Sequence, residues 1–363
     1  MVIGTQLDHA PKFWDKSSEW YLPEAKAIMV SFADFYKSKA KRKSAMEKGL
    51  REYLGVQPDT LVYLDNGAFA FWRKGLERPI DDYVEFVKQA KPDWYPVPTD
   101  FIPHPQLSPS AQRVLFEKTM RMNLEYASGG YVPVIHAGDW LEEYLEDLEK
   151  NQVPLSKGVG LGGLVPRLLT TKGSTSREGV VDAIRRTREY IRTELHVFGI
   201  GGLTTLHLAA SLGVDSIDSS GWRNRAARGL ILLPGRGERS VVPLGNWGGV
   251  EVSEGEIRML EACACPACQR YGVVGLRACN ARGNKEDRGN GTSGFNRRAI
   301  HNLWTLLREA EEVDSKLRSG AYKSWYRQHV AGSILLRLIE YALDGRHDLQ
   351  GTDSKPWSNA ASH

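Results

Sequence analysis

The sequence predicts an α/β protein whose parallel strands, each followed by a helix, close into a (β/α)8 TIM barrel with a zinc-binding subdomain inserted near the C-terminus. Three observations predict this fold class. Short apolar runs alternate with helical patterns through the first two thirds of the chain, polar residues or glycines follow the apolar runs, and three of the four cysteines fall within six positions.

The apolar runs mark the expected strands. They are IMVSF (28 to 32), LVYL (61 to 64), DWYPVP (93 to 98), YVPVI (131 to 135), KGVGL (157 to 161), HVFGI (196 to 200), DSI (215 to 217) and LILL (230 to 233). Between them, apolar residues recur at helical spacing in IDDYVEFVKQA, SAQRVLFEKTMRMNLEYA, WLEEYLEDLEK, EGVVDAIRRTREYIRTE and TTLHLAASLG. This rhythm builds a closed barrel or an open doubly wound sheet, and a strand count near eight favours the barrel.

Composition is that of an ordinary globular protein, with 363 residues, 41% hydrophobic and 25% charged. No apolar run approaches the ~18 residues that a membrane helix needs, and the N-terminus lacks the apolar core of a signal peptide, so we expect a cytoplasmic protein without a membrane partner. The expected organisation is a barrel over 1–255, a zinc-binding subdomain with a basic loop over 256–310, helices packing on the barrel over 311–345, and a flexible tail over 346–363.

Polar residues and glycines stand just past the expected strands. They are Asp65, Asp100, His136, the glycine pair 162–163, the glycine-rich turn 199–202, and Asp218. In a parallel barrel the C-terminal ends of all strands open on one catalytic face, so these residues should converge there. Taken singly, an aspartate after a strand is often a helix N-cap and a lone histidine often a core hydrogen-bonding group. Their convergence favours an active site.

The stretch CACPACQRYG places Cys263, Cys265 and Cys268 too close together for a disulfide framework. Tetrahedral zinc explains the spacing, with Cys279 or His301 as the fourth ligand and free structural cysteines as the alternative. His301 lies in RRAIHNLWTLLRE, which has the pattern of an amphipathic helix. Three thiolates and a histidine would fill all four positions, so this Zn²⁺ should be structural; a hydrolase using zinc catalytically would need an open position.

Basic residues cluster in three segments. Lys and Arg outnumber acidic residues by seven to one over 37–51, five to one over 221–239, and seven to two over 270–298. Such clusters are typical of proteins that bind polyanions, although a solvated helix face has the same composition.

Four motifs resemble those of the tRNA-guanine transglycosylases. CACPAC followed by AIHNL resembles the zinc signature of that family, LDNGAF its Asp-Ser-Gly-Gly-Phe segment, GLGGL its base-binding turn, and GVDSIDSSGWRNRAARG the stretch with the nucleophilic aspartate. The motifs follow the family order from about residue 60 to about 307. The resemblance implies a pentosyltransferase that exchanges guanine for another base through a covalent aspartyl-glycosyl intermediate.

The resemblance also implies roles for individual residues. Asp218 would be the nucleophile and Asp65 the general base, while Asp100 and the turn of Gly162, Gly163 and Leu164 would bind the base. His136 stands where the family usually has glutamine, and could donate to the exocyclic oxygen of the base. The zinc ligands would be Cys263, Cys265, Cys268 and His301.

The front half, with YLDNGAFAFWRKG, PIDDYVEFVKQ and PVIHAGDWLEEYLEDL, looks most like the branch that inserts 7-deazaguanine bases into DNA. The expected partners are then DNA and a free base such as 7-cyano-7-deazaguanine, with proteins of a DNA-modification system as further candidates. Base flipping needs phosphate clamps, for which the candidates are Arg223, Arg225, Arg228, Arg282 and Arg288.

Two other functions stay open at this point. The first is the same chemistry on tRNA, although the chain ends soon after the expected barrel, without room for the RNA-binding C-terminal module of archaeal members. The second is a catalytically silent nucleic-acid-binding subunit. The presence of both Asp65 and Asp218 argues against silence.

Overall fold

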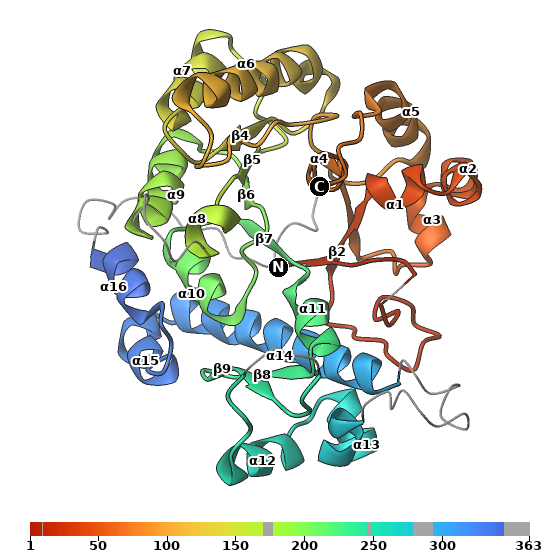
Figure 1. The fold of residues 1–363 in the computed structure, drawn as a ribbon, viewed down its shortest axis with the longest axis vertical. Coiled ribbons are helices and arrows are strands. Elements are labelled where there is room, and N and C mark those ends of the chain that lie inside the picture. Colours follow the sequence, from red (N-terminus) through yellow and green to blue (C-terminus); the bar gives the residue numbers. More distant parts are fainter. Residues whose placement is uncertain (9, 170–176, 245–248, 279–292, 345–363) are drawn as a thin grey trace.

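The computed structural model describes residues 1–363 except 9, 170–176, 245–248, 279–292 and 345–363 (Figure 1). Its strands are β1 (Val2–Gly4), β2 (Ala27–Ser31), β3 (Leu61–Asp65), β4 (Val134–His136), β5 (Val159–Gly162), β6 (Leu195–Val197), β7 (Ser216–Ser219), β8 (Leu230–Leu233) and β9 (Gly237–Ser240). The first seven form one parallel sheet in the order β3-β2-β1-β7-β6-β5-β4. The sheet is curled, as an α/β barrel-type fold requires (Figure 1).

The segment 94–97 links the two edges of this sheet. Trp94 makes a parallel bridge to Tyr63 beside β3, and Pro96 makes one to Val132 just before β4. On the β3 side, the Leu64 N–H donates to the Trp94 carbonyl at 2.9 Å; on the β4 side, the Val97 N–H donates to the Val132 carbonyl at 3.0 Å. The expected strand at 93–98 therefore contributes bridges to both edges.

The prediction that LILL is the eighth barrel strand is wrong. These residues form β8, which pairs antiparallel with β9 apart from the main sheet. All four leucine and isoleucine side chains are buried, and β8 packs against a helix, which explains why the run is continuously apolar. The place in the sheet belongs instead to β1, which lies between β2 and β7. Three residues are too few to give a periodic signal.

The helices are interspersed with the strands through the first two thirds of the chain and follow one another after β9. They are α1 (Phe32–Tyr36), α2 (Lys39–Lys48), α3 (Leu50–Leu54), α4 (Ala68–Arg73), α5 (Ile80–Ala90), α6 (Pro109–Tyr126), the 3-10 turn η1 (Ala127–Gly129), α7 (Leu141–Lys150), α8 (Val165–Leu169), α9 (Glu178–Tyr190), α10 (Leu203–Ser211), α11 (Gly221–Ala227), α12 (Glu254–Glu261), α13 (Pro266–Arg277), α14 (Ser293–Arg318), α15 (Tyr322–His329) and α16 (Leu336–Asp344).

All five helices expected from apolar periodicity are present as α5, α6, α7, α9 and α10. Helix α6 illustrates their start signals, because Ser108 accepts the Ala111 N–H at 3.3 Å and Pro109 occupies the first helical position. Helix α8 begins at Val165, directly after the GLGGL turn, with Pro166 in its first turn. Proline is tolerated there because the first-turn N–H groups have no partner within the helix.

Side chains fill both sides of the sheet. Inside the curl, a cluster of Val2, Ala27, Met29, Tyr63, Trp94 and Val132 packs with partly buried Phe198. Two larger clusters lie between the strands and the surrounding helices. The interior of the curl is therefore a packed core, as in parallel barrels generally.

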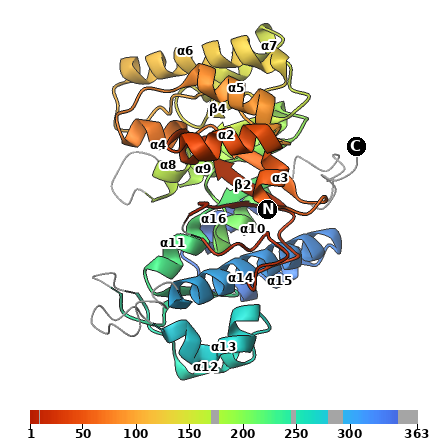
Figure 2. The same ribbon diagram turned by 90° about the vertical axis from the view of Figure 1, so that its right-hand side faces the viewer.

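The C-terminal part is organised by α14, which packs against α10, α11, α13 and β8 (Figures 1 and 2). This helix runs without a break through residue 310, where we expected a subdomain boundary. None of the helices in the described part of the chain combines the length and the apolar character needed to cross a bilayer. The expected tail at 346–363 lies outside the described residues.

Candidate active site

Three aspartates stand at one end of the curled sheet. Asp65 is the last residue of β3, Asp100 follows the linking segment 94–97, and Asp218 lies in β7. Helices α4, α8 and α11 follow β3, β5 and β7 and lie on the same side of the molecule in Figure 2, with α3 on the other. The aspartates therefore occupy the C-terminal face of the strands, as the sequence predicts.

Asp65 is held as a partly buried carboxyl group. Its Oδ2 accepts the Ser31 hydroxyl at 2.8 Å and the Gly67 N–H at 3.0 Å. Burial, helped by the negative charges of Asp100 and Asp218, raises the pKa of Asp65 to about 6 in spite of these hydrogen bonds. A carboxyl group with this pKa can both give and accept a proton near neutral pH.

Asp100 is bound on both oxygens. Its Oδ2 lies 2.9 Å from His136 Nε2, and its Oδ1 accepts from Asn66 Nδ2 at 3.0 Å. Burial acts to raise the pKa of Asp100, but the hydrogen bond and charge of His136 outweigh it and the pKa is lowered. Asp100 is thus an anionic hydrogen-bond acceptor whose carboxylate group is held in one orientation.

His136 is fully enclosed by protein contacts. Besides Asp100, its ring meets Tyr144, whose hydroxyl lies 3.2 Å from Nδ1. Both ring nitrogens are occupied and the residue is 1% exposed. We expected that His136 could donate to a bound base; in this arrangement it orients Asp100 instead, and Asp100 is the group left to face a ligand.

The GLGGL turn packs directly against His136. A Cβ on Gly162 would lie 3.0 Å from the His136 ring, and Gly163 has a left-handed φ of +77° with the Ala137 carbonyl close by. Both positions therefore favour glycine. Leu164 is fully buried in the core between sheet and helices, so only its backbone could contact a base.

The second glycine turn encloses Asp218. The Gly199 N–H donates to Asp218 Oδ1 at 2.5 Å, and the Gly201 N–H donates to the Asp218 carbonyl at 2.9 Å. A Cβ on Gly201 would lie 2.4 Å from that carbonyl oxygen, a distance that excludes any side chain. The turn thus fixes Oδ1 and leaves Oδ2 as the oxygen available for chemistry.

Sequence reasoning missed four side chains that support the aspartates: Ser31, Asn66, Tyr144 and His196. The first three are hydrogen-bond partners described above. His196 lies under Asp218, with Nε2 3.6 Å from Asp218 Oδ1 and Nδ1 2.8 Å from the Ser216 hydroxyl. The position of His196 could have been predicted from strand alternation. It stands two residues before Phe198, and residues two apart in a strand point to the same face. Tyr144 lies on a separate helix, and nothing in the sequence pairs it with His136.

The predicted zinc ligands come together from three elements. Cys263 follows α12, Cys265 caps α13 and precedes Cys268 in its first turn, and His301 lies on α14. The His301 Nδ1 lies 3.6, 3.6 and 3.4 Å from the sulfurs of Cys263, Cys265 and Cys268 respectively. These three thiols are free of disulfides.

This geometry fits a tetrahedral metal. With zinc bond lengths of about 2.3 Å to sulfur and about 2.0 Å to nitrogen, a sulfur and a nitrogen ligand lie about 3.5 Å apart, close to the three distances found. The His301 Nε2–H donates to the Leu232 carbonyl at 2.9 Å, which leaves the Nδ1 lone pair facing the sulfurs. The four residues could therefore hold a metal ion with no position open. Cys279 lies outside the described residues.

The predicted phosphate clamps are only partly described. Arg223, Arg225 and Arg228 lie on or next to α11, which follows Asp218 at the same face. Arg225 pairs with Glu238 at 2.7 Å, Arg223 contacts Gln6, and Arg228 is exposed. Arg282 and Arg288 lie outside the described residues.

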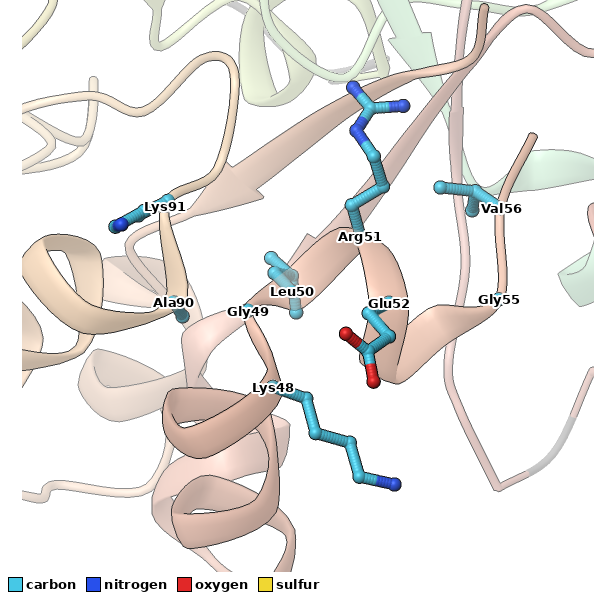
Figure 3. A pocket seen from close by; sticks show the side chains of 9 residues that line it. All are labelled: Lys48, Gly49, Leu50, Arg51, Glu52, Gly55, Val56, Ala90 and Lys91. Carbon is cyan, nitrogen blue, oxygen red and sulfur yellow. The ribbon is translucent and has the colours of Figure 1, made fainter. Parts of the chain in front are cut away.

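A pocket of about 540 Å³ is lined by the residues labelled in Figure 3. It is formed by the ends of α2 and α5 together with α3. These elements precede β3 and the segment 94–97, so the pocket is at the opposite, N-terminal end of the strands and none of the three aspartates lines it.

Comparison with known proteins decides the family. The sequence profile of the family described as queuine tRNA-ribosyltransferase matches residues 24–333. The chain belongs to this family. The match spans every element from β2 to α15, including the three aspartates and the Cys3His cluster, so the family resemblance expected from four motifs is confirmed.

The chain is similar to several curated archaeal proteins. The tRNA-guanine(15) transglycosylase of Pyrococcus furiosus is 26% identical over 310 residues, which are 81% of this chain and 46% of that protein. Its namesake in Methanocaldococcus jannaschii is 25% identical over 315 residues, 82% of this chain and 43% of that protein. The chain thus spans about half the length of the curated relatives it matches.

Proposed function

We propose that this protein is a guanine transglycosylase that replaces guanine in DNA with a 7-deazaguanine base. The observation that carries the base-exchange chemistry is the meeting of three aspartates in different states at one end of the sheet. Asp218 has one oxygen fixed by Gly199, Asp65 has a pKa of about 6, and Asp100 is an oriented anion. Three carboxyl groups match the three tasks of the reaction.

In the first half-reaction, Asp218 Oδ2 bonds to C1′ of the nucleotide as the C1′–N9 bond breaks. The electron pair leaves with N9 of guanine, which takes a proton from protonated Asp65. In the second, the incoming base gives its N9 proton to ionised Asp65, its nitrogen bonds to C1′ from the opposite side, and the ester bond to Asp218 breaks. Two inversions retain the configuration, and every group returns to its starting state.

Asp100 would bind the exchanging base. Its carboxylate can accept from the N1–H and exocyclic amine that guanine and its 7-deaza analogues share. Since His136 and Asn66 hold both oxygens in place, base binding would need little reorientation of Asp100. The Cys263, Cys265, Cys268 and His301 site would hold structural Zn²⁺ and take no part in the exchange.

We further propose that the segment 94–97 takes the place of the eighth strand and closes the sheet into a barrel. Its bridges to both edge strands support this, as does the convergence of site residues at one end. In this division the barrel occupies 1–255 and the zinc-binding subdomain 256–310, with α14 shared between the subdomain and the helices of 311–345.

DNA is preferred over tRNA because the segments around Asp65 and His136 resemble the DNA-modifying branch. The alternative is tRNA, which is favoured by the printed names of the archaeal relatives. The test is to incubate purified protein with radiolabelled guanine, or with labelled 7-cyano-7-deazaguanine, and either plasmid DNA or bulk tRNA. Label entering DNA only supports the proposal. Label entering tRNA establishes the alternative, and label in neither indicates a silent subunit or a missing partner protein.

The pH dependence should report Asp65. In the second half-reaction Asp65 must be ionised, so kcat/KM for the incoming base should fall as the pH is lowered through about 6. Ser31→Ala removes a hydrogen bond that favours the carboxylate, and should move this acid limb to higher pH. Comparing pH-rate profiles of the two proteins checks this, and identical acid limbs would contradict the assignment of Asp65 as base.

The raised pKa also has a consequence for stability. Because the pKa of Asp65 is higher in the folded protein than its ordinary 3.8, the folded state loses stability as the pH rises from about 4 to about 6. Asp65→Asn should therefore raise the melting temperature at pH 7.5 while base exchange is lost. Melting curves at pH 5 and pH 7.5 test the sign, since the gain should be smaller at pH 5.

A further inference from the structure

Large apolar side chains are exposed on the helix that follows Asp65. Phe69 and Trp72 on α4 are 53% and 54% exposed, and Leu76 just beyond it is 49% exposed. The Phe69 and Trp72 rings lie 5.8 Å apart. Single exposed apolar residues are common, but three on one short stretch indicate a contact surface.

Cationic residues accompany these rings. The Arg73 guanidinium lies over the Phe69 ring at 5.8 Å, and the next residue, Lys74, is exposed. The positive charge of Lys37 is the main cause of a lowered pKa at Lys74, so the two ammonium groups share a positive field. The acids near them are Asp34, which pairs with Lys37 at 3.5 Å, and exposed Glu77.

The pattern continues toward Asp100. The Arg78 guanidinium stacks over the Phe101 ring at 4.2 Å, and the Lys118 ammonium lies 5.5 Å from the same ring. Arg78 Nε has no hydrogen-bond partner among the described residues. Phe101 directly follows Asp100, so aromatic and cationic groups lie beside two of the three aspartates.

We propose that the α4 rim, made up of Phe69, Trp72, Arg73, Lys74, Arg78 and Phe101, binds the DNA strand next to the nucleotide that enters the site. Trp72 would stack on a neighbouring base, and the cations would contact phosphates. This rests on the proposed function for the choice of DNA. The chemistry itself follows from the surface, because single-stranded nucleic acid is bound by positive charge interleaved with aromatic rings.

Base flipping would explain why the Trp72 indole is exposed. Taking a nucleotide out of a duplex leaves its neighbours without a stacking partner, and enzymes that distort DNA often place an apolar side chain against such a step. Trp72 is exposed on the helix that starts three residues after Asp65, so it is close to where such a gap would form. An apolar protein partner would explain the rings but not the surrounding cations.

Binding and turnover should be measured separately on the whole chain. Fluorescence anisotropy with a labelled DNA duplex gives affinity without any reaction, and base exchange is followed with labelled guanine. Trp72→Ala should weaken DNA binding by about tenfold, while Trp72→Phe retains most of the affinity, because one lost stacking contact has that effect. Arg73→Ala combined with Lys74→Ala should weaken binding and lower the slope of log affinity against log salt by up to about two.

The control residues are exposed and lie far from α4 in the fold. The apolar control is Ile334→Ala, at a residue that is 82% exposed, and the cationic control is Lys323→Ala, at an exposed residue on α15. Neither substitution should change the affinity for DNA by more than twofold. Trp72→Ala binding DNA as tightly as the unaltered protein would overturn the proposal, and so would Trp72-dependent binding of tRNA without binding of DNA. If the protein binds DNA in a Trp72-dependent way but exchanges no base, the proposal for the α4 rim is supported and the proposed reaction is contradicted.

Discussion

Asp218→Asn is expected to abolish base exchange, lowering its rate by at least about three orders of magnitude. An amide has nearly the shape of the carboxylate, and its oxygen can still accept the Gly199 N–H that now meets Oδ1 at 2.5 Å. What is lost is the carboxylate oxygen Oδ2, which attacks C1′ in the proposed reaction. The structure around the turn should be unchanged, so the effect should fall on the chemical step.

Trapping the covalent intermediate tests this directly. The unaltered protein, incubated with DNA and without an incoming base, should give a protein–DNA adduct that survives a denaturing gel. The Asp218→Asn variant should give none, while binding DNA with the same affinity and melting at a similar temperature. An adduct in the variant would assign the nucleophile to another residue, with Asp65 the first to examine.

The second large effect is expected from removing the metal site. Cys265 is fully buried, and its sulfur accepts the Cys268 N–H at 3.2 Å as well as facing His301. Cys265→Ser should remove one zinc ion per chain and lower the melting temperature by at least about 10 °C, because zinc binding contributes directly to folding free energy. Zinc content by elemental analysis and melting curves with and without a chelator measure both effects.

Cys279→Ser is the matched control for that experiment. If His301 is the fourth ligand, as the distances indicate, this variant keeps its zinc and its melting temperature. Loss of zinc from Cys279→Ser with retention in His301→Ala would contradict the ligand set.

Loss of the metal should also lower the activity of the candidate active site. Next to His301, the Asn302 side chain donates to the carbonyls of Trp222 and Leu230, and Arg298 donates to the Ala226 carbonyl. Trp222 and Ala226 lie on α11, directly after the strand with Asp218. A zinc-free protein is therefore expected to lose activity even where its barrel remains folded.

Much of the fold was predictable because its signals are local. Apolar runs and helical periodicity located β2 to β7 and the five long barrel helices, since each element carries its own pattern. The short β1 carries almost none, and its place is set by pairing with β2 and β7, which are distant in sequence. The apolar run at β8 predicts a strand but does not indicate which strand it pairs with. The sequence therefore predicts the strand correctly and its sheet wrongly.

The candidate site divides in the same way. The aspartates at strand ends were expected to meet because a parallel sheet brings all such ends to one face. The Cys3His cluster was expected because the cysteine spacing matches a tetrahedral ion. The role of His136 was not predictable, because it depends on Tyr144 and Asp100 occupying both ring nitrogens. Contacts between separate elements leave no pattern in a single sequence.

The position of β1 has a consequence for how the chain is made. Val2 pairs with Asp218 and Ile3 with Ser219, so β1, which is made before the other strands of this sheet, is a neighbour of β7, the last of them to be made. Until then the free edges of β1 and β6 cannot meet β7, and nascent or prematurely terminated chains expose backbone groups that pair readily with other molecules. Chaperone protection during synthesis should matter most before residue 219 emerges. The same late step that closes the sheet also sets the proposed nucleophile in place.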